Sequence, residues 1–303
     1  MSNEKPTVSL VLSSGGARGN AQIGAIEVLE EEGYKIKAIS GSSIGAAIGG
    51  CYAAGHLQDY KEWISSLNQF DVFKLMDFTI STQGLIKGQR VFNILEELIG
   101  NPLIEDLPIP FTAVATDLRQ RQEVWFREGN LLKAIRASVS IPTLITPHYH
   151  DGREFIDGGV LNPLPIDAGN QADADYVIAV NLNADIPYQK PINYRNNESG
   201  QETSITYLFN RFAERWQLFT NQKPQSREEN FSYVNLISST FNLMNIRMTE
   251  MILERSQPDL IIPVSGEACA TMEFYRSGEM IEAGREATQK VLASLPKKNV
   301  YAS

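Results

Sequence analysis

The chain has 303 residues, of which 43% are hydrophobic and 21% charged, a composition typical of a soluble globular protein with one or two domains. Its net charge of -9 argues against a nucleic-acid-binding protein, because phosphate backbones favour clustered Lys and Arg. Neither a signal-like run at residues 1–6 nor an apolar run of ~18 residues occurs, so we expect a cytoplasmic protein.

Strand and helix signals alternate along the chain. Short β-branched runs predict strands at 7–12, 36–40, 110–116, 176–181 and 260–264. Helical spacing and glycine stops predict helices at 21–32, 44–54, 231–256 and 272–295. Strands that alternate with helices need crossover connections, so the sequence predicts an α/β fold whose mainly parallel sheet is covered on both faces.

One domain over residues 7–295 accounts for this pattern, followed by a polar tail at 296–303. The segment 185–202 is polar and contains proline, and we expect a surface loop there.

Two later segments carry large apolar residues at helical spacing. In 205–220 these are Ile205, Leu208, Phe209, Phe212, Trp216 and Phe219. This segment has two interpretations, a helix packed in the core or a lid that contacts acyl chains or a membrane surface. For the series Met244, Met248 and Met251 we favour core packing.

A sharp turn is indicated at 41–45 (GSSIG), between a predicted strand and a predicted helix. A Gly-x-Ser-x-Gly pattern in this context is typical of a nucleophile elbow, which exposes its central serine at a helix N-terminus. The helix dipole and free N–H groups there favour negative charge. The pattern therefore indicates that Ser43 is a catalytic nucleophile.

A second glycine-rich turn lies at 14–19 (SGGARG), again between a strand and a helix. Its backbone N–H groups can converge on an anion, either a phosphate or the oxyanion of an acyl intermediate. The segment lacks the Gly-Lys-Ser/Thr ending of a phosphate-binding loop. Beside a nucleophile elbow, an oxyanion hole is the better interpretation.

Ser43 needs a proton acceptor, and the chain has three histidines. His56 lies at the far end of the helix that follows Ser43, about 20 Å away at ~1.5 Å of rise per residue, and cannot serve. A Ser-Asp-His triad would use His148 or His150, with Asp117 as the orienting acid.

The other candidate base is Asp157, which follows an apolar pair and precedes Gly158 and Gly159. Glycines at these positions allow a neighbouring loop to approach the carboxylate. An ordinary Asp has a pKa near ~4, so partial burial would make it a better base. A simple Asp-Gly turn explains the same residues, and from these patterns alone the identity of the base stays open.

Three segments occur together in one order: 14–19 (SGGARG), 41–45 (GSSIG) and 157–159 (DGG). With this combination the chain resembles the patatin-like phospholipase family over nearly its whole length. Supporting similarities lie at 115–118 (ATDL), 136–142 (RASVSIP) and 157–165 (DGGVLNPLP). One departure is Ser14, which stands where some members carry another glycine.

The resemblance implies a patatin-type three-layer α/β/α fold and a Ser–Asp dyad, with Ser43 as nucleophile and Asp157 as base. It implies an oxyanion hole at Gly15, Gly16, Ala17 and Arg18. It also implies hydrolysis of carboxylic esters in lipids or phospholipids through an acyl-enzyme, without a metal or organic cofactor. The expected partner is a lipid substrate, met in transient contact with a membrane surface.

Two other functions stay open at this point. One is a Ser-His-Asp esterase that acts on small soluble esters. The other is a lipid- or acyl-binding protein that keeps the elbow but has lost turnover.

Overall fold

The computed structural model describes residues 5–77, 87–169, 173–192, 194 and 233–295. Within these residues one sheet has the strand order β5-β6-β3-β2-β1-β7-β8, with β4 paired to β3. The strands are β1 (Thr7–Leu12), β2 (Lys35–Ser42), β3 (Phe111–Asp117), β4 (Gln122–Phe126), β5 (His148–His150), β6 (Arg153–Asp157), β7 (Tyr176–Ala184) and β8 (Leu260–Ser265). The α-helices are α1 (Asn20–Glu31), α2 (Ile44–Ala53), α3 (Leu57–Ser66), α4 (Gln69–Leu75), α5 (Gln89–Ile99), α6 (Leu131–Ser138), α8 (Tyr233–Arg255) and α9 (Ser277–Ala293).

The five predicted strands are all present, and they pair in parallel as expected for an α/β fold. The sequence did not predict β4, β5 and β6, which form an antiparallel extension around β3. These strands have five residues or fewer and lack a long apolar run, so little local signal marks them.

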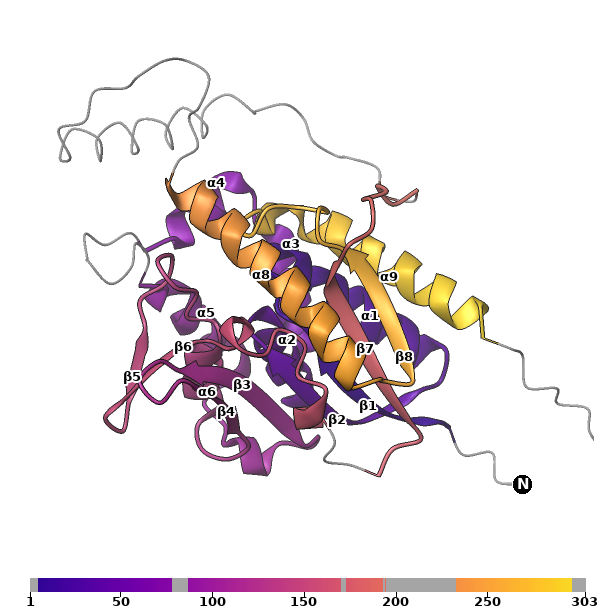
Figure 1. Cartoon of the computed structure of the whole chain (residues 1–303), viewed down its shortest axis with the longest axis horizontal. Helices are drawn as coiled ribbons and strands as arrows, with labels where there is room; N and C mark the ends of the chain where they lie inside the picture. The colour runs from indigo at the N-terminus through magenta and orange to yellow at the C-terminus, as the bar shows by residue number, and fades with distance from the viewer. Residues whose placement is uncertain (1–4, 78–86, 170–172, 193, 195–232, 296–303) are drawn as a thin grey trace, which may run out of the picture.

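Helices cover both faces of the sheet, giving three layers (Figure 1). On one face α1, α2 and α9 cover the strands, and α1 packs along α9. The opposite face carries α8, which crosses the sheet near β7 (Figure 1). The α/β/α architecture predicted from the sequence is therefore correct.

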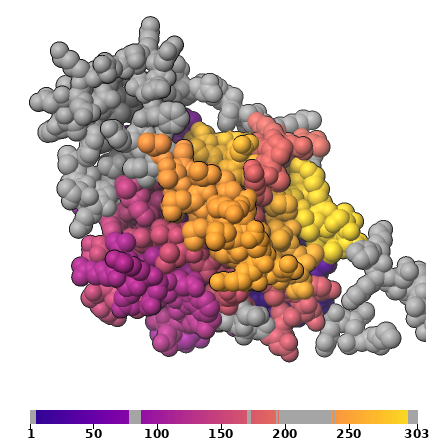
Figure 2. All heavy atoms as spheres, viewed as in Figure 1, coloured from indigo at the N-terminus to yellow at the C-terminus, as the bar shows by residue number. Residues whose placement is uncertain are grey.

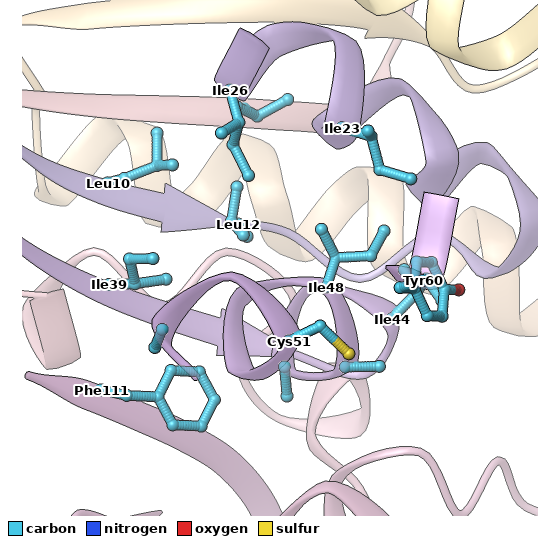
Figure 3. Packing of buried hydrophobic residues seen from close by; sticks show 14 of the residues in the cluster. Leu10, Leu12, Ile23, Ile26, Ile39, Ile44, Ile48, Cys51, Tyr60 and Phe111 are labelled. Atoms are coloured by element: carbon cyan, nitrogen blue, oxygen red, sulfur yellow. The ribbon is translucent and has the colours of Figure 1, made fainter. Parts of the chain in front are cut away.

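The main hydrophobic core lies between the sheet and the layer that contains α1 and α2. Leu10 and Leu12 of β1 point into this core, where Figure 3 shows them facing Ile26 of α1 and Ile48 of α2. The intervening Val11 belongs to a smaller cluster on the α8 side of the sheet. This alternation follows from the two-residue period of a strand that is covered on both faces.

The exposure of side chains on α8 contradicts the predicted core packing of its methionines. Met244 and Met251 are 49% and 56% exposed, so core packing was the wrong prediction for them. Asn245 and Thr249 of the same helix are buried instead. The inward side of α8 faces polar groups at the carboxyl end of β7, where Thr249 accepts a hydrogen bond from Asn183. This contact explains why polar residues of α8 are turned inward. Figure 2 shows α8 across the front surface of the molecule.

Two further expectations concern segments near the end of the chain. The predicted helix at 272–295 begins later, at Ser277, after a 3-10 turn at Phe274–Arg276. The segment 205–220 and the tail 296–303 lie outside the described residues, as do residues 193 and 195–202 of the predicted loop at 185–202. Over the described part of the chain, no helix combines the length and apolar character needed to cross a membrane.

Candidate active site

The edge of β3 brings the two predicted catalytic segments together. One half of this edge pairs with β2, ending at the pair Ser42–Val114. The next residue, Ala115, pairs with Asp157 at the end of β6. Because β4 occupies the opposite edge of β3, β2 and β6 share one edge and meet end to end. Neighbouring residues of one strand thus hold the last residues of β2 and β6 side by side.

The turn at Ser43 has the geometry of a nucleophile elbow. Ser43 has φ 55° and ψ -124°, a conformation that costs a non-glycine residue on the order of 1–3 kcal/mol. A Cβ at Gly41 would lie 2.3 Å from the carbonyl oxygen of Gly45, and one at Gly45 would lie 2.3 Å from that of Leu12. Both glycines of the motif are therefore required by close backbone contacts, and Ser43 is placed at the N-terminus of α2.

Ser43 and Asp157 are in direct contact. The Ser43 hydroxyl donates a hydrogen bond of 2.5 Å to Oδ2 of Asp157, while Oδ1 accepts one of 2.7 Å from the N–H of Gly159. Burial raises the pKa of Asp157 from 3.8 to about 7, although the hydrogen bonds from Ser43 and Gly159 act to lower it. A carboxylate with a pKa near neutral is suited to accept a proton at neutral pH.

The glycine loop lies beside this pair, at the carboxyl end of β1. Its residues Gly16–Gly19 form a 3-10 turn, η1, and Gly16 has φ 58°. The N–H of Ala17 donates to the carbonyl of Thr271 at 2.9 Å, so it is already occupied. The N–H groups of Gly15 and Gly16 have no acceptor among the described residues. Gly15 and Gly16 of the predicted oxyanion hole thus keep a free backbone donor.

The Arg18 side chain lies in a buried polar environment. It is buried, and its guanidinium donates to three neutral oxygens, those of Asn242 at 2.6 Å, Asn183 at 3.4 Å and the Cys269 carbonyl at 3.3 Å. Burial lowers the pKa of Arg18, and no carboxylate of the described chain pairs with it. Asn183 also donates to the carbonyl of Ser14, so these contacts anchor the glycine loop to β7 and α8.

The residues of the alternative triad are not arranged around Ser43. Asp117 pairs with Arg153 at 2.7 Å and accepts from the backbone of residues 119 and 120. His148 and His150 lie on the edge strand β5 and stack on each other. Burial, aided by Arg136 and His150, lowers the pKa of His148 to about 4. All three histidines are described, and none hydrogen-bonds to Ser43.

An apolar cavity of about 150 Å³ opens beside Ser43. Its walls come from α2 and from the helices α3, α4, α5 and α6, which the sequence analysis did not assign. Residues that line it include Tyr60, Trp63, Val72, Phe92, Leu95 and Ile135. Helically spaced apolar residues mark these helices in the sequence. The segment that was predicted to contact acyl chains, 205–220, lies outside the described residues.

Between residues 5 and 295, wherever the chain is described, no group of three or more His, Cys, Asp or Glu is placed to hold a metal ion.

Comparison with known proteins identifies the family of the chain. Residues 10–169 match the family described as patatin-like phospholipase. An uncharacterized NTE family protein of Mycobacterium tuberculosis is 48% identical over 181 residues, which cover 60% of this chain and 50% of the relative. A second such protein of that organism is 30% identical over 96% of this chain and 47% of its own length.

Two further matches extend over nearly the whole chain. The human patatin-like phospholipase domain-containing protein 6 is 26% identical, over 97% of this chain and 21% of the relative. The crystal structure of VipD from Legionella pneumophila superimposes with a TM-score of 0.56 at 15% identity, covering 97% of this chain and 67% of VipD. The chain thus spans half or less of the length of the mycobacterial and human relatives. By its match over residues 10–169, the chain belongs to the patatin-like phospholipase family.

Proposed function

We propose that this protein is a serine acyl hydrolase that cleaves carboxylic esters of lipids, with Ser43 as nucleophile and Asp157 as base. The observation that carries the proposal is the 2.5 Å hydrogen bond between these side chains at the edge of an apolar cavity. Membership of the patatin-like phospholipase family supports hydrolysis of lipid esters as the reaction class.

The first half of the reaction follows from the polarity of this hydrogen bond. Asp157 takes the proton of the Ser43 hydroxyl as the oxygen attacks the ester carbonyl. The resulting oxyanion accepts hydrogen bonds from the N–H groups of Gly15 and Gly16, a class of interaction commonly worth about 3–4 kcal/mol per donor. Asp157 then gives its proton to the departing alcohol, and an acyl ester of Ser43 remains.

The second half releases the acid. Asp157, again ionised, accepts a proton from a water molecule that attacks the acyl carbonyl. The tetrahedral intermediate collapses, the proton returns to Ser43, and the carboxylic acid leaves. Arg18 and Ala17 have a supporting function in both halves of the reaction. Their hydrogen bonds to Asn242 and Thr271 fix the glycine loop, whose Gly15 and Gly16 N–H groups bind the oxyanion.

The cavity supports a hydrocarbon chain as the acyl group. Its lining is almost wholly apolar and contains large aliphatic and aromatic side chains. A dry apolar cavity of about 150 Å³ is known to hold a benzene-sized molecule. The cavity therefore takes a short acyl chain or the first part of a longer one, and its described lining favours an apolar acyl group over a polar one.

Labelling with a fluorophosphonate probe tests the nucleophile and the base. The parent should be labelled, Ser43→Ala should not react, and Asp157→Asn should react at least about 1,000-fold more slowly, since residues of a catalytic unit are individually essential. Labelling of Ser43→Ala at the parent rate would refute the assignment of Ser43.

Turnover of a p-nitrophenyl ester by the double variant His148→Ala/His150→Ala separates the dyad from a histidine triad. Retained turnover excludes the triad, whereas a loss as large as that of Asp157→Asn would favour it. An acyl-binding protein without turnover would show no ester hydrolysis in the parent.

The pKa of Asp157 predicts how activity depends on pH. The free enzyme needs the ionised carboxylate, so kcat/KM should rise with pH and reach half its plateau near pH 7, where Asp157 titrates. A pH–rate profile between about pH 4 and 9 checks this. A half-plateau near pH 4 would contradict the raised pKa of Asp157.

A further inference from the structure

The backbone of the nucleophile has a partner that lies outside the elbow. The N–H of Ser43 donates to the hydroxyl oxygen of Ser138 at 2.9 Å, and Ser138 is the last residue of α6. The Ser138 hydroxyl in turn donates to the carbonyl of Val114 at 2.6 Å. This second bond uses the only proton of the hydroxyl, so its lone pair is directed at Ser43.

The Val114 carbonyl belongs to the part of β3 that also holds the rest of the site. Val114 pairs with Ser42 of β2, and the next residue, Ala115, pairs with Asp157. Ser138 therefore connects the strained residue of the elbow to the strand on which the two catalytic segments meet. It is completely buried and is not itself one of the residues that line the cavity.

The same end of α6 also holds the base. The N–H of Asp157 donates to the carbonyl of Ser140 at 2.9 Å. Two residues apart, Ser138 and Ser140 thus bind the backbones of the nucleophile and the base. The Ser140 hydroxyl has a separate partner, since it bonds to Arg136.

We propose that Ser138 is a positioning residue for the nucleophile, which holds the Ser43 backbone in its left-handed conformation and so keeps the hydroxyl on Asp157. This inference rests on the function proposed above. Without the Ser138 oxygen, the Ser43 N–H is buried and unpaired, and the elbow is free to relax from φ 55°. Relaxation would move the Ser43 oxygen away from Asp157, and misplacements of about 1 Å cost on the order of 100-fold in rate.

The test compares Ser138→Ala with Ser9→Ala in the full chain, on a soluble p-nitrophenyl ester. Ser9 is a matched control because it is also buried and its hydroxyl donates to a backbone carbonyl, that of Gly169, at 2.5 Å. Ser138→Ala should lower kcat and the fluorophosphonate labelling rate about 10- to 100-fold, with KM changed less than about two-fold. Ser9→Ala should keep the parent kcat, although it also loses a buried hydrogen bond, one against the two of Ser138→Ala.

A pH profile adds a readout that simple destabilisation would not move. The hydrogen bond from Ser43 lowers the pKa of Asp157, so weakening it should shift the acid limb of kcat/KM to higher pH in Ser138→Ala and not in Ser9→Ala. If Ser138→Ala does not fold, Ser138→Thr, which keeps the hydroxyl, should have a kcat within about three-fold of the parent.

Equal kcat values and equal acid limbs for Ser138→Ala and the parent would overturn the assignment. So would a folded Ser138→Thr whose kcat falls more than about 10-fold. Either result, in a parent that hydrolyses the ester, leaves the proposed function intact. A parent that neither hydrolyses the ester nor reacts with the probe contradicts the proposed function itself.

Discussion

Asp157 is a buried carboxyl group in a setting that favours its neutral form. It is completely buried, and its contacts within hydrogen-bond distance are the Ser43 hydroxyl and the N–H of Gly159. In the folded protein its pKa is about 7, against 3.8 for a free side chain. Between these values the folded state binds more protons than the unfolded state, so stability falls as pH rises from about 4 to about 7.

Asp157→Asn should therefore stabilise the protein at neutral and alkaline pH while it abolishes turnover. An amide does not ionise, so the variant avoids a penalty that grows by about 1.4 kcal/mol per pH unit within this window. Thermal unfolding should give a higher Tm for the variant than for the parent at about pH 8. The difference should disappear at about pH 4, where the parent's Asp157 is protonated.

Asp117 provides a control of opposite sign. Burial alone would raise the pKa of this carboxyl, but hydrogen bonds from Gln120 and Arg153 hold it below its usual value. The ionised form is thus stabilised in the folded state, and Asp117→Asn should lower Tm at about pH 8. A lower Tm for Asp157→Asn at this pH would contradict the account given for the base.

At the scale of elements, α8 is coupled to the glycine loop through its polar side. Asn242 accepts the shortest hydrogen bond of the Arg18 guanidinium, at 2.6 Å, and the inward Thr249 accepts from Asn183. Apolar residues such as Leu243, which is 67% exposed, lie on the outward side. The contact of α8 with the loop is thus built from polar bonds around a buried cation.

Asn242→Ala should weaken this coupling. It removes a neutral acceptor from a buried charged donor, a bond typically worth about 1.5–3 kcal/mol. We expect a lower Tm and a kcat reduced several-fold on a soluble ester, because η1 would be less well held beside Ser43. Leu243→Ser on the outward side of the same helix serves as the control and should change neither value. An unchanged kcat in Asn242→Ala would show that the loop keeps its position without α8.

At the scale of the whole molecule, the apolar cavity beside Ser43 is assembled from elements distant in sequence. Ser43 and α2 form one wall, and α3 to α6 contribute others, together with residues 271, 272 and 274. The helix α4 carries none of the proposed catalytic residues, and its Val72 is buried in the lining. A larger residue there reduces the cavity volume without touching the dyad.

Val72→Phe should therefore change the preference for acyl chain length. We expect kcat/KM for an octanoate ester to fall at least about 10-fold relative to an acetate ester, since each buried CH₂ contributes about 0.8 kcal/mol. The ratio is measured within one variant, so a general loss of folded protein cancels. An unchanged ratio would show that the acyl chain does not enter this cavity.

Local sequence was sufficient to locate the central strands and the elbow. The runs at β1 and β7 are largely buried on both faces, and that at β8 is buried on one face and half-buried on the other. All three read as nearly continuous apolar stretches, as parallel strands do. The glycines that flank Ser43 are forced by backbone contacts within the turn and its neighbouring strand, so the motif is visible in the sequence.

The sequence by itself therefore determined the α/β class, the turn at Ser43 and the small set of candidate bases. Its local patterns could not determine which base meets the serine, and Asp157 was indicated only by the family resemblance. The reason is that Ser43 and Asp157 are 114 residues apart and meet only through their shared pairing with β3. The raised pKa of Asp157, the inward polar side of α8 and the hydrogen bond from Ser43 to Ser138 likewise arise from burial and long-range contacts. Only the tertiary structure decided these features, since local patterns encode the preferences of each segment but not the neighbours it acquires.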